Sequence, residues 1–572
     1  MIPMLQASSE EGKALMARAR VAVPGLAVLT LIRAIFLLAP AFYVLLVLDV
    51  ALPGHSFSSV LSLSGLLVLV LAGWAGLGRM RHGMLRHVGA MAQHGLVPRL
   101  DQATARLAEA GISGDGDETQ IARDLDALGH FLLGGDAERV MDLAGLPVFL
   151  LMALVLHGWF ALAMLVGALM LGGLLRVALR REAEGAGEAL ALVGRRHAMM
   201  ETSRGHSDTI RALGMDGAAR QAWSLVNAGL WRLSGDRERA ADLRVRIAQG
   251  IRLTMAVAMV MIGAALVLHN AASVAVVLAA VALGWLALAP LAGLIAQVGG
   301  LVAARQGWDR LDQVLAAVPA PAPAMALAPP VARLACESVA VMPPGRRKPV
   351  VTGLSFALEA GQVLAIVGPG GGGKSAALRT LAGAWEPAAG SVRLDGAALG
   401  QWDRQALARH IGYLPQGIDL IDGTVGENIA RFAGDADPQA IIQAAREAGA
   451  HDMILRLPEG YATRVGRHGR RLSLSEAQRI GLARALFGEP FLIALDEPSA
   501  HLDAPTGQHL AATIAAARKR GAVVLLAGSA PGLMTMASHV LILRDGAMAW
   551  FGEKEKLQAR SQAAKANAKV IS

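Results

Sequence analysis

Six long apolar runs in the first three hundred positions constrain the fold of this chain more than any other feature. Each run is close to the roughly 20 residues that a helix needs to cross the apolar core of a bilayer. Because backbone groups in lipid must be hydrogen-bonded within the segment, we expect these runs to be membrane-spanning helices. They lie at residues 24–48, 58–78, 141–157, 159–178, 250–268 and 272–298.

The positions of lysine and arginine between the runs predict how the helices are oriented. Neither residue occurs in the turns after the first, third and fifth runs, around Asp49–Ser58, His157–Gly158 and His269–Asn270. The segments Arg79–Val140 and Arg180–Arg252 instead hold many arginines. Since positively charged loops stay on the cytoplasmic side, we expect these two segments and both chain ends in the cytoplasm. The first 20 residues carry several charges and no apolar core, so no signal peptide is predicted.

The two cytoplasmic segments are rich in Ala, Leu, Arg and Glu, so each is predicted to form a pair of helices that extends away from the membrane. Pro40 in the first run and Pro147 in the third are predicted to kink or open their helices. Arg33 lies inside the first run, where a charge is expensive. We expect it to face the bundle interior or to reach the interface, and a role in translocation is the alternative.

Composition indicates a membrane protein that also has a soluble part. Of the 572 residues, 54% are hydrophobic and 17% charged, and the mean hydropathy is +0.45. These values are too apolar for a soluble protein of this size. We attribute the net charge of +9 to the cytoplasmic arginines and predict no nucleic-acid partner. Cys336 is the only cysteine, which excludes an intrachain disulfide and a cysteine metal site.

A glycine-rich stretch in the second half of the chain predicts a nucleotide site. Gly368–Ser375 fits the pattern G-x-x-x-x-G-K-[ST], a strand-like run precedes it, and Ala376–Leu381 is predicted to begin a helix. In that context backbone N–H groups converge on the phosphates of a nucleotide, and a glycine-rich turn without a ligand is the alternative. We predict that ATP contacts Gly368, Pro369, Gly370, Gly371, Gly372, Gly373, Lys374, Ser375 and Ala376.

A second apolar strand supplies the carboxylates that such a site needs. The run Phe491–Leu495 ends in Asp496 and Glu497. The hydroxyl of Ser375 and the Asp496 carboxylate are predicted to hold Mg²⁺, while Lys374 reaches the terminal phosphates. ATP and Mg²⁺ are therefore the expected cofactors.

A proline- and alanine-rich stretch separates the two halves of the chain. Residues 1–318 are predicted to form the transmembrane domain with its cytoplasmic helical extensions. Residues 319–330 form the linker. Residues 331–572 are predicted to form the nucleotide-binding domain, whose alanine- and lysine-rich end is expected to be a solvated tail.

Further motifs in this half resemble the ATP-binding cassette (ABC) proteins. Gln416, at the end of Ile411–Gln416, looks like the Q-loop glutamine, and Gly423–Ile429 is similar to the segment that follows it in exporter cassettes. Asp496 and Glu497 look like the Walker B aspartate and catalytic glutamate, and Ser499–Asp503 looks like the D-loop. Six spans ahead of one cassette resemble the ABC exporters, and among them the type I secretion ATPases that export unfolded proteins. Four segments point to that branch: Leu48–Pro53, Leu146–Phe149, Ile210–Met215 and Gly412–Phe432.

The resemblance implies a six-helix transmembrane bundle fused to an α/β P-loop ATPase domain. It implies a dimer, because each ATP is enclosed by the phosphate loop of one chain and the signature helix of the other. Gln416 is then implied to sense the γ-phosphate or the metal, and Glu497 to orient or deprotonate the attacking water. The implied location is the bacterial inner membrane. The implied partners are a second half-transporter, membrane lipid, a periplasmic adaptor, an outer-membrane channel and an exported polypeptide.

The chain departs from the family at two catalytic motifs. The signature Leu-Ser-Gly-Gly-Gln appears as Leu472–Glu476, in which Ser473, Ser475 and Glu476 are the residues implied to face the partner's nucleotide. Side chains in place of both glycines are expected to crowd the γ-phosphate, and Glu476 is expected to repel it. Ser529 stands where the switch histidine is expected, and Arg467 replaces an expected acidic residue.

Three interpretations of the chain follow. It is an ATP-driven exporter that acts as a homodimer and tolerates these changes, or it is a catalytically weak subunit that pairs with a consensus half-transporter. A small-molecule or lipid exporter is a further alternative, because such exporters share the six-span plan.

Overall fold

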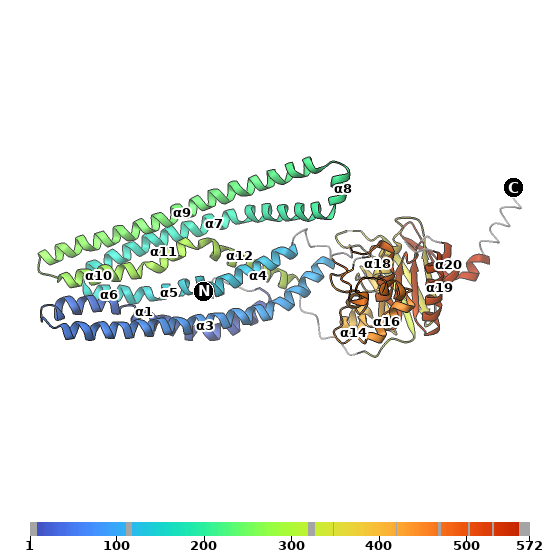
Figure 1. Ribbon diagram of the computed structural model, residues 1–572, viewed down its shortest axis with the longest axis horizontal. Coiled ribbons are helices and arrows are strands. Elements are labelled where there is room, and N and C mark those ends of the chain that lie inside the picture. The colour runs from blue at the N-terminus through green and yellow to red at the C-terminus, as the bar shows by residue number, and fades with distance from the viewer. Residues whose placement is uncertain are drawn as a thin grey trace. The chain divides into compact units, whose positions relative to one another are not determined.

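The computed structural model describes residues 8–109, 117–318, 327–346, 348–418, 420–466, 471–500, 504–528 and 531–559. By its internal contacts the chain divides into two compact units (Figure 1). One comprises residues 1–108 and 113–320 and is helical, and the other comprises residues 109–112 and 321–572 and is built on a β-sheet.

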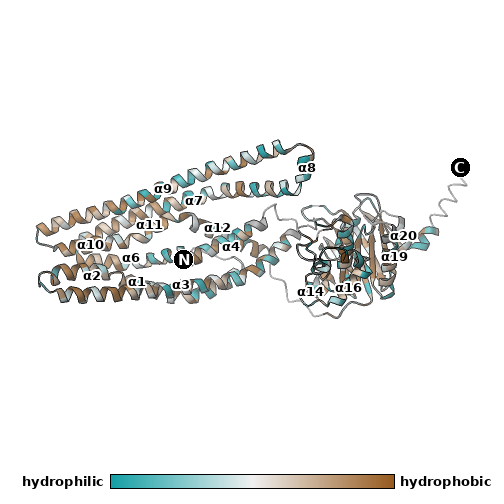
Figure 2. Cartoon of the chain, viewed as in Figure 1, coloured by the Kyte–Doolittle hydropathy of each residue, from teal (hydrophilic) through white to brown (hydrophobic). Residues whose placement is uncertain are grey.

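In its described residues, the helical unit contains six helices or helix pairs long and apolar enough to cross a membrane, as predicted. Figure 2 shows the apolar residues gathered towards the end of this unit where α2, α6 and α10 are labelled. The long helices Phe57–Glu109, Gly158–Gly205 and Asp216–Leu268 each join an apolar stretch to polar sequence, so the predicted helical extensions are present. The elements are α1 (Glu10–Phe36), α2 (Ala39–Leu46), a π-helical turn (Val47–Ala51), α3 (Phe57–Glu109), α4 (Asp117–Leu133), α5 (Asp136–Asp142), a 3₁₀ turn (Leu143–Gly145), α6 (Leu146–Leu156), α7 (Gly158–Gly205), α8 (Ser207–Ala212), α9 (Asp216–Leu268), α10 (Val274–Ala287), α11 (Ala289–Ala296) and α12 (Val298–Ala317).

Prolines interrupt three of the spans. Pro40 lies in the first turn of α2, directly after the break at the end of α1, and Pro147 lies in the first turn of α6. Both positions agree with the predicted kinks, because proline has no N–H to give to a preceding helical turn. Pro290 separates α10 from α11 in the same way, an interruption that the sequence analysis missed.

Arg33 faces the interior of the helical unit. Its guanidinium lies 4.5 Å from the centre of the Trp74 ring and about 4 Å from the carboxylates of Glu138 and Asp142. The neighbouring Arg81 is completely buried and pairs with the same two carboxylates at 3.1 and 2.5 Å. The charge in the first apolar run is therefore neutralised within the bundle, which agrees with the structural rather than the translocation interpretation.

In the part of the chain that the structure describes, the second unit contains a ten-stranded sheet with strand order β5-β4-β1-β2-β10-β9-β3-β8-β7-β6. Strands β3, β7, β8 and β6 pair in parallel, and their buried, branched residues explain why helices cover both faces. The strands are β1 (Arg333–Val341), β2 (Val351–Glu359), β3 (Val363–Val367), β4 (Ala389–Leu394), β5 (Ala397–Ala398), β6 (Ile411–Leu414), β7 (Leu492–Asp496), β8 (Val523–Ala527), β9 (His539–Arg544) and β10 (Ala547–Glu553).

The helices of this unit are mostly short. They are α13 (Lys374–Leu381), α14 (Arg404–Ala408), α15 (Val425–Ile429), α16 (Pro438–Glu447), α17 (His451–Leu455), α18 (Leu474–Leu486), α19 (Ala504–Lys519) and α20 (Pro531–Met536). The carboxyl ends of β3, β7 and β6 lie at one edge of the sheet, where β7 ends at Asp496 and where the phosphate loop and Gln416 follow β3 and β6. In open parallel sheets this edge is where ligands bind.

Candidate nucleotide site

The phosphate loop joins the buried strand β3 to α13, as the sequence predicts. Gly371 and Gly373 have φ values of +75° and +88°, which strain any residue with a Cβ atom. A Cβ at Gly373 would also lie 2.3 Å from the side chain of Val351, and one at Gly368 would lie 2.5 Å from the carbonyl of Leu543. Glycine is therefore required in this loop by both backbone conformation and space.

Lys374 folds back over the loop that precedes it. Its ammonium donates to the carbonyl oxygens of Gly368 and Pro369, both at 3.0 Å. No carboxylate is paired with this ammonium among the described residues. The positive charge is thus held over the phosphate loop by weak neutral acceptors, which an anionic phosphate can replace.

Asp496 ends β7 as a buried carboxylate that is only partly satisfied. It is 1% exposed, and its Oδ2 atom has no hydrogen-bond partner within the described part of the chain. Burial raises the pKa of Asp496, and a hydrogen bond with Ser375 opposes that shift. A desolvated, unpartnered oxygen beside a hydroxyl is an oxygen-donor set of the kind that a hard divalent cation takes.

Gln416 and Glu497 meet across the same edge of the sheet. The Nε2 group of Gln416 donates to Oε2 of Glu497 over 3.1 Å, which leaves the Gln416 carbonyl oxygen available. Glu497 has a φ of +46°, and its N–H donates to the Ala527 carbonyl at 2.8 Å. For a residue other than glycine this conformation costs roughly 1–3 kcal/mol and is typical of functional positions. The carboxylate of Glu497 contacts Gln416 from this backbone conformation, a pairing that the sequence alone did not predict.

The signature segment forms a self-contained helix cap. The Ser473 N–H and hydroxyl both donate to Oε2 of Glu476 at 2.8 Å, and the Glu476 N–H donates to the Ser473 hydroxyl at 3.3 Å. This arrangement is a capping box at the N-terminus of α18. Leu474, which replaces the first signature glycine, is 69% exposed. This cap was not among the predicted features, although the spacing Ser-x-x-Glu is its usual signal.

Several predicted residues lie outside the described residues. They are Ser529 at the switch position, Arg467, the D-loop residues 501–503, and residues 319–326 of the linker. The described residues bring together the phosphate loop, Ser375, Asp496, Gln416 and Glu497. Ser473 and Glu476 are engaged with each other at the start of α18.

Comparisons with known proteins agree with this architecture. Residues 351–500 match the family described as ABC transporter. The type I secretion system ATP-binding protein PrsD of Rhizobium meliloti (strain 1021) is 35% identical over 541 residues, which cover 94% of this chain and 92% of that protein. Human ATP-binding cassette sub-family B member 6 is 35% identical over 207 residues, which cover 36% of this chain and 24% of that protein.

A solved structure extends the likeness over both units of the chain. The structure of a bacterial Atm1-family ABC exporter with ATP bound has a TM-score of 0.78 and covers 97% of this chain and 99% of that chain. Its sequence identity of 22% makes this a statement about the fold alone. Six spans followed by one cassette are thus a known arrangement, as predicted.

Proposed function

Since the chain belongs to the ABC exporters as a half-transporter with an ABC-type ATPase domain, we propose that it is the ATP-driven subunit of a type I secretion system. In this proposal it lies in the bacterial inner membrane with its ATPase domain and both termini in the cytoplasm. It exports an unfolded polypeptide, with a periplasmic adaptor and an outer-membrane channel as partners. The likeness to the Rhizobium secretion protein over 94% of the chain supports the proposal.

The observation that carries the ATPase function is the pairing of Gln416 with Glu497 beside the phosphate loop. The loop N–H groups and Lys374 bind and orient the phosphates. The Ser375 hydroxyl, Asp496 and the Gln416 carbonyl oxygen would hold Mg²⁺, which neutralises phosphate charge when bound. Glu497, oriented by Gln416, accepts a proton from the attacking water at a carboxylate oxygen. These residues position and polarise the reactants, which is how phosphoryl transfer is mainly catalysed.

The capping box at α18 favours a second, compatible candidate. In a dimer, the site that uses this chain's signature meets a helix N-terminus that is already capped, because the Ser473 N–H donates to the Glu476 carboxylate and the Glu476 N–H donates to the Ser473 hydroxyl. That site would turn over slowly, whereas the site formed by this chain's phosphate loop and a consensus partner would not. A heterodimer with a consensus half-transporter is therefore the second candidate, and the homodimer gives two slow sites.

Two experiments test the proposed function. Proteins in the culture medium are quantified for cells that carry the wild-type chain and for cells that carry Glu497→Gln, with equal amounts of chain in the membrane. We expect one or a few proteins to disappear from the medium of the variant. An unchanged set of secreted proteins, together with altered release of a lipid or small molecule, would contradict protein export and favour the other exporter class.

The second experiment identifies the partner. The chain is purified with an affinity tag from its own membrane, and the co-purified half-transporters are counted by intact mass. Recovery of a second, different half-transporter with an intact signature supports the heterodimer. Recovery of this chain alone supports the homodimer.

A further inference from the structure

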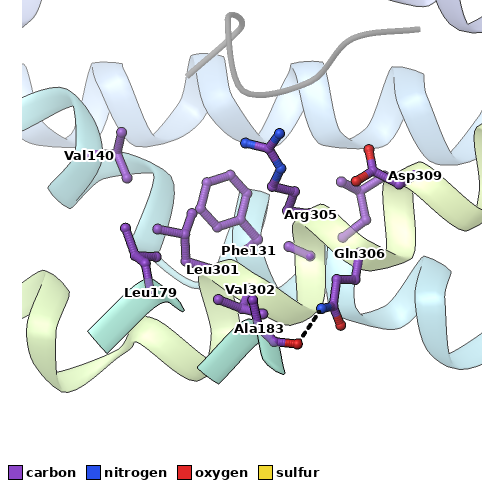
Figure 3. A pocket seen from close by; sticks show the side chains of 11 residues that line it. Phe131, Val140, Leu179, Ala183, Leu301, Val302, Arg305, Gln306 and Asp309 are labelled. Carbon is purple, nitrogen blue, oxygen red and sulfur yellow. Dashed lines mark hydrogen bonds between the residues drawn. The ribbon is translucent and has the colours of Figure 1, made fainter. Parts of the chain in front are cut away.

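The helical unit contains a cavity of about 350 Å³ that the proposed export cycle does not explain. Figure 3 shows its lining residues, which come from four elements. The apolar lining consists of Leu128 and Phe131 of α4, Val140 of α5, Leu179 and Ala183 of α7, and Leu301, Val302 and Ala304 of α12. A volume above about 300 Å³ with a mainly apolar wall and a few polar groups is typical of ligand pockets.

In the orientation proposed above, the cavity lies at the cytoplasmic edge of the membrane. The sixth span ends at Ala296, and α12 begins at Val298 and leads away from it. On α12, the apolar lining residues Leu301 and Val302 come first and the polar lining residues follow them. Along α12, the cavity wall is therefore apolar nearer the sixth span and polar farther from it, as an amphipathic ligand requires.

The polar end of the cavity carries one positive and one negative side chain. Arg305 and Asp309 lie one turn apart on α12, and Figure 3 shows both side chains on the same side of that helix. Neither forms a salt bridge among the described residues. Gln306 is already used, because its Nε2 group donates to the Ala183 carbonyl at 3.2 Å and ties α12 to α7. Arg305 and Asp309 are thus the charged groups left for a ligand.

We propose that this cavity binds an acyl chain of a phospholipid from the cytoplasmic leaflet whose headgroup carries both a phosphate and a primary ammonium. The acyl chain lies against Leu179, Leu301 and Val302. The Arg305 guanidinium binds the phosphate, and the Asp309 carboxylate accepts hydrogen bonds from the ammonium. A quaternary ammonium headgroup has no N–H to donate, and a purely anionic headgroup places its charge near Asp309, so both are bound less well.

The lining residues favour lipid over an exported polypeptide. A polypeptide needs backbone hydrogen-bond partners along its length, and the wall offers mainly hydrocarbon with its polar groups confined to one end. One cation and one anion at that end match a zwitterionic headgroup.

Native mass spectrometry of the full-length chain tests the proposal. The protein is reconstituted in nanodiscs with equal parts phosphatidylethanolamine, phosphatidylcholine and phosphatidylglycerol, transferred to mild detergent, and the lipids retained per chain are counted. We expect one phosphatidylethanolamine per chain. Arg305→Gln is expected to lower its retention about tenfold through loss of a charge-assisted contact. Asp309→Asn is expected to remove the preference over phosphatidylcholine and to keep some lipid bound.

A variant that fills the cavity and a matched control variant distinguish lipid bound in the cavity from lipid bound at the protein surface. Ala183→Trp places an indole at the cavity wall and is expected to abolish retention. Ala303→Trp adds the same side chain at an exposed α12 position outside the lining and is expected to have no effect. A monodisperse elution profile for each variant shows that it is folded, and the Arg305 and Asp309 variants give a result even where Ala183→Trp does not fold.

Three results would overturn the proposal. One is equal retention of the three lipids by the wild type, and another is unchanged phosphatidylethanolamine retention in both Arg305→Gln and Ala183→Trp. The third is recovery of a polypeptide from a photo-crosslinker placed at position 302, which would assign the cavity to cargo.

Discussion

The phosphate loop and the signature segment each lead into a helix N-terminus, α13 and α18, yet the two termini differ in what already occupies them. Among the described residues, Lys374 at the loop donates only to neutral carbonyl oxygens, and Oδ2 of Asp496 has no hydrogen-bond partner. At α18, the Glu476 carboxylate accepts from the N–H and hydroxyl of Ser473 and so takes the position of an anion. The comparison teaches that a helix N-terminus presents an anion site only when the chain does not supply its own anion.

Of the changes at the phosphate-loop site, loss of the Glu497 carboxylate should lower ATP turnover the most. Glu497→Gln keeps the shape and the contact with Gln416 but cannot accept a proton, so ATP turnover is expected to fall by about 10²–10⁴-fold. Nucleotide binding, measured by isothermal titration, should remain. Glu386→Gln, an exposed carboxylate in the same unit, is the control. A Glu497→Gln rate close to the wild-type rate would remove Glu497 from catalysis.

Removing the Lys374 ammonium at the phosphate loop should lower both ATP turnover and ATP binding. Lys374→Ala is expected to lower turnover by roughly 10²–10³-fold, as loss of a preorganised charge does at a developing anion. In contrast to Glu497→Gln, it should also weaken ATP binding. Lys519→Ala removes an exposed lysine of α19 and should change neither quantity. If Lys374→Ala bound ATP as tightly as wild type, the loop would not be the phosphate site.

Gln416 tests whether the contact with Glu497 matters for turnover. Gln416→Ala removes the 3.1 Å hydrogen bond and the available carbonyl oxygen, and we expect about a tenfold lower rate at saturating ATP. Gln416→Glu restores an oxygen atom that could bind the metal, but its carboxylate repels that of Glu497. The ATPase rate should therefore stay below that of wild type. Full activity in both variants would show that Glu497 is oriented without Gln416.

Because the Asp496 carboxylate is buried, it should make the thermal stability of the chain depend on pH. Burial raises its pKa in the folded chain above the ordinary value of 3.8. At a pH above the folded pKa, the charged carboxylate therefore lowers the free energy of unfolding. Asp496→Asn is therefore expected to raise the Tm at neutral pH, and the gain should shrink as the pH falls through the folded pKa towards 3.8. Added Mg²⁺ with ATP should stabilise wild type and not the variant. An equal Tm for both at neutral pH would contradict this account.

The sequence could predict the parts of the molecule that local pattern determines. The apolar runs and the placement of arginine are sufficient to predict the six spans. The glycine-rich pattern that ends in Lys374 and Ser375, directly after a strand-like run, is sufficient to predict the phosphate loop. It could not predict that Glu497 adopts a positive φ and meets Gln416, since their contact depends on the parallel pairing of β6 with β7. The break at Pro290 and the cap at Glu476 do have local signals. The cap was missed because the same residues also align with a phosphate-binding consensus.

The most direct test of the difference between the two elements is the ATPase rate of the purified chain before and after its signature is restored. Wild type and the triple variant Leu474→Gly/Ser475→Gly/Glu476→Gln are compared in lipid nanodiscs at saturating ATP. The rate of a separate Lys374→Ala protein is subtracted from both as the blank. We predict that the restored chain is about tenfold faster, because the α18 N-terminus no longer holds its own carboxylate. A wild-type rate equal to that of the restored chain would contradict the account and show that the capping box opens freely during turnover.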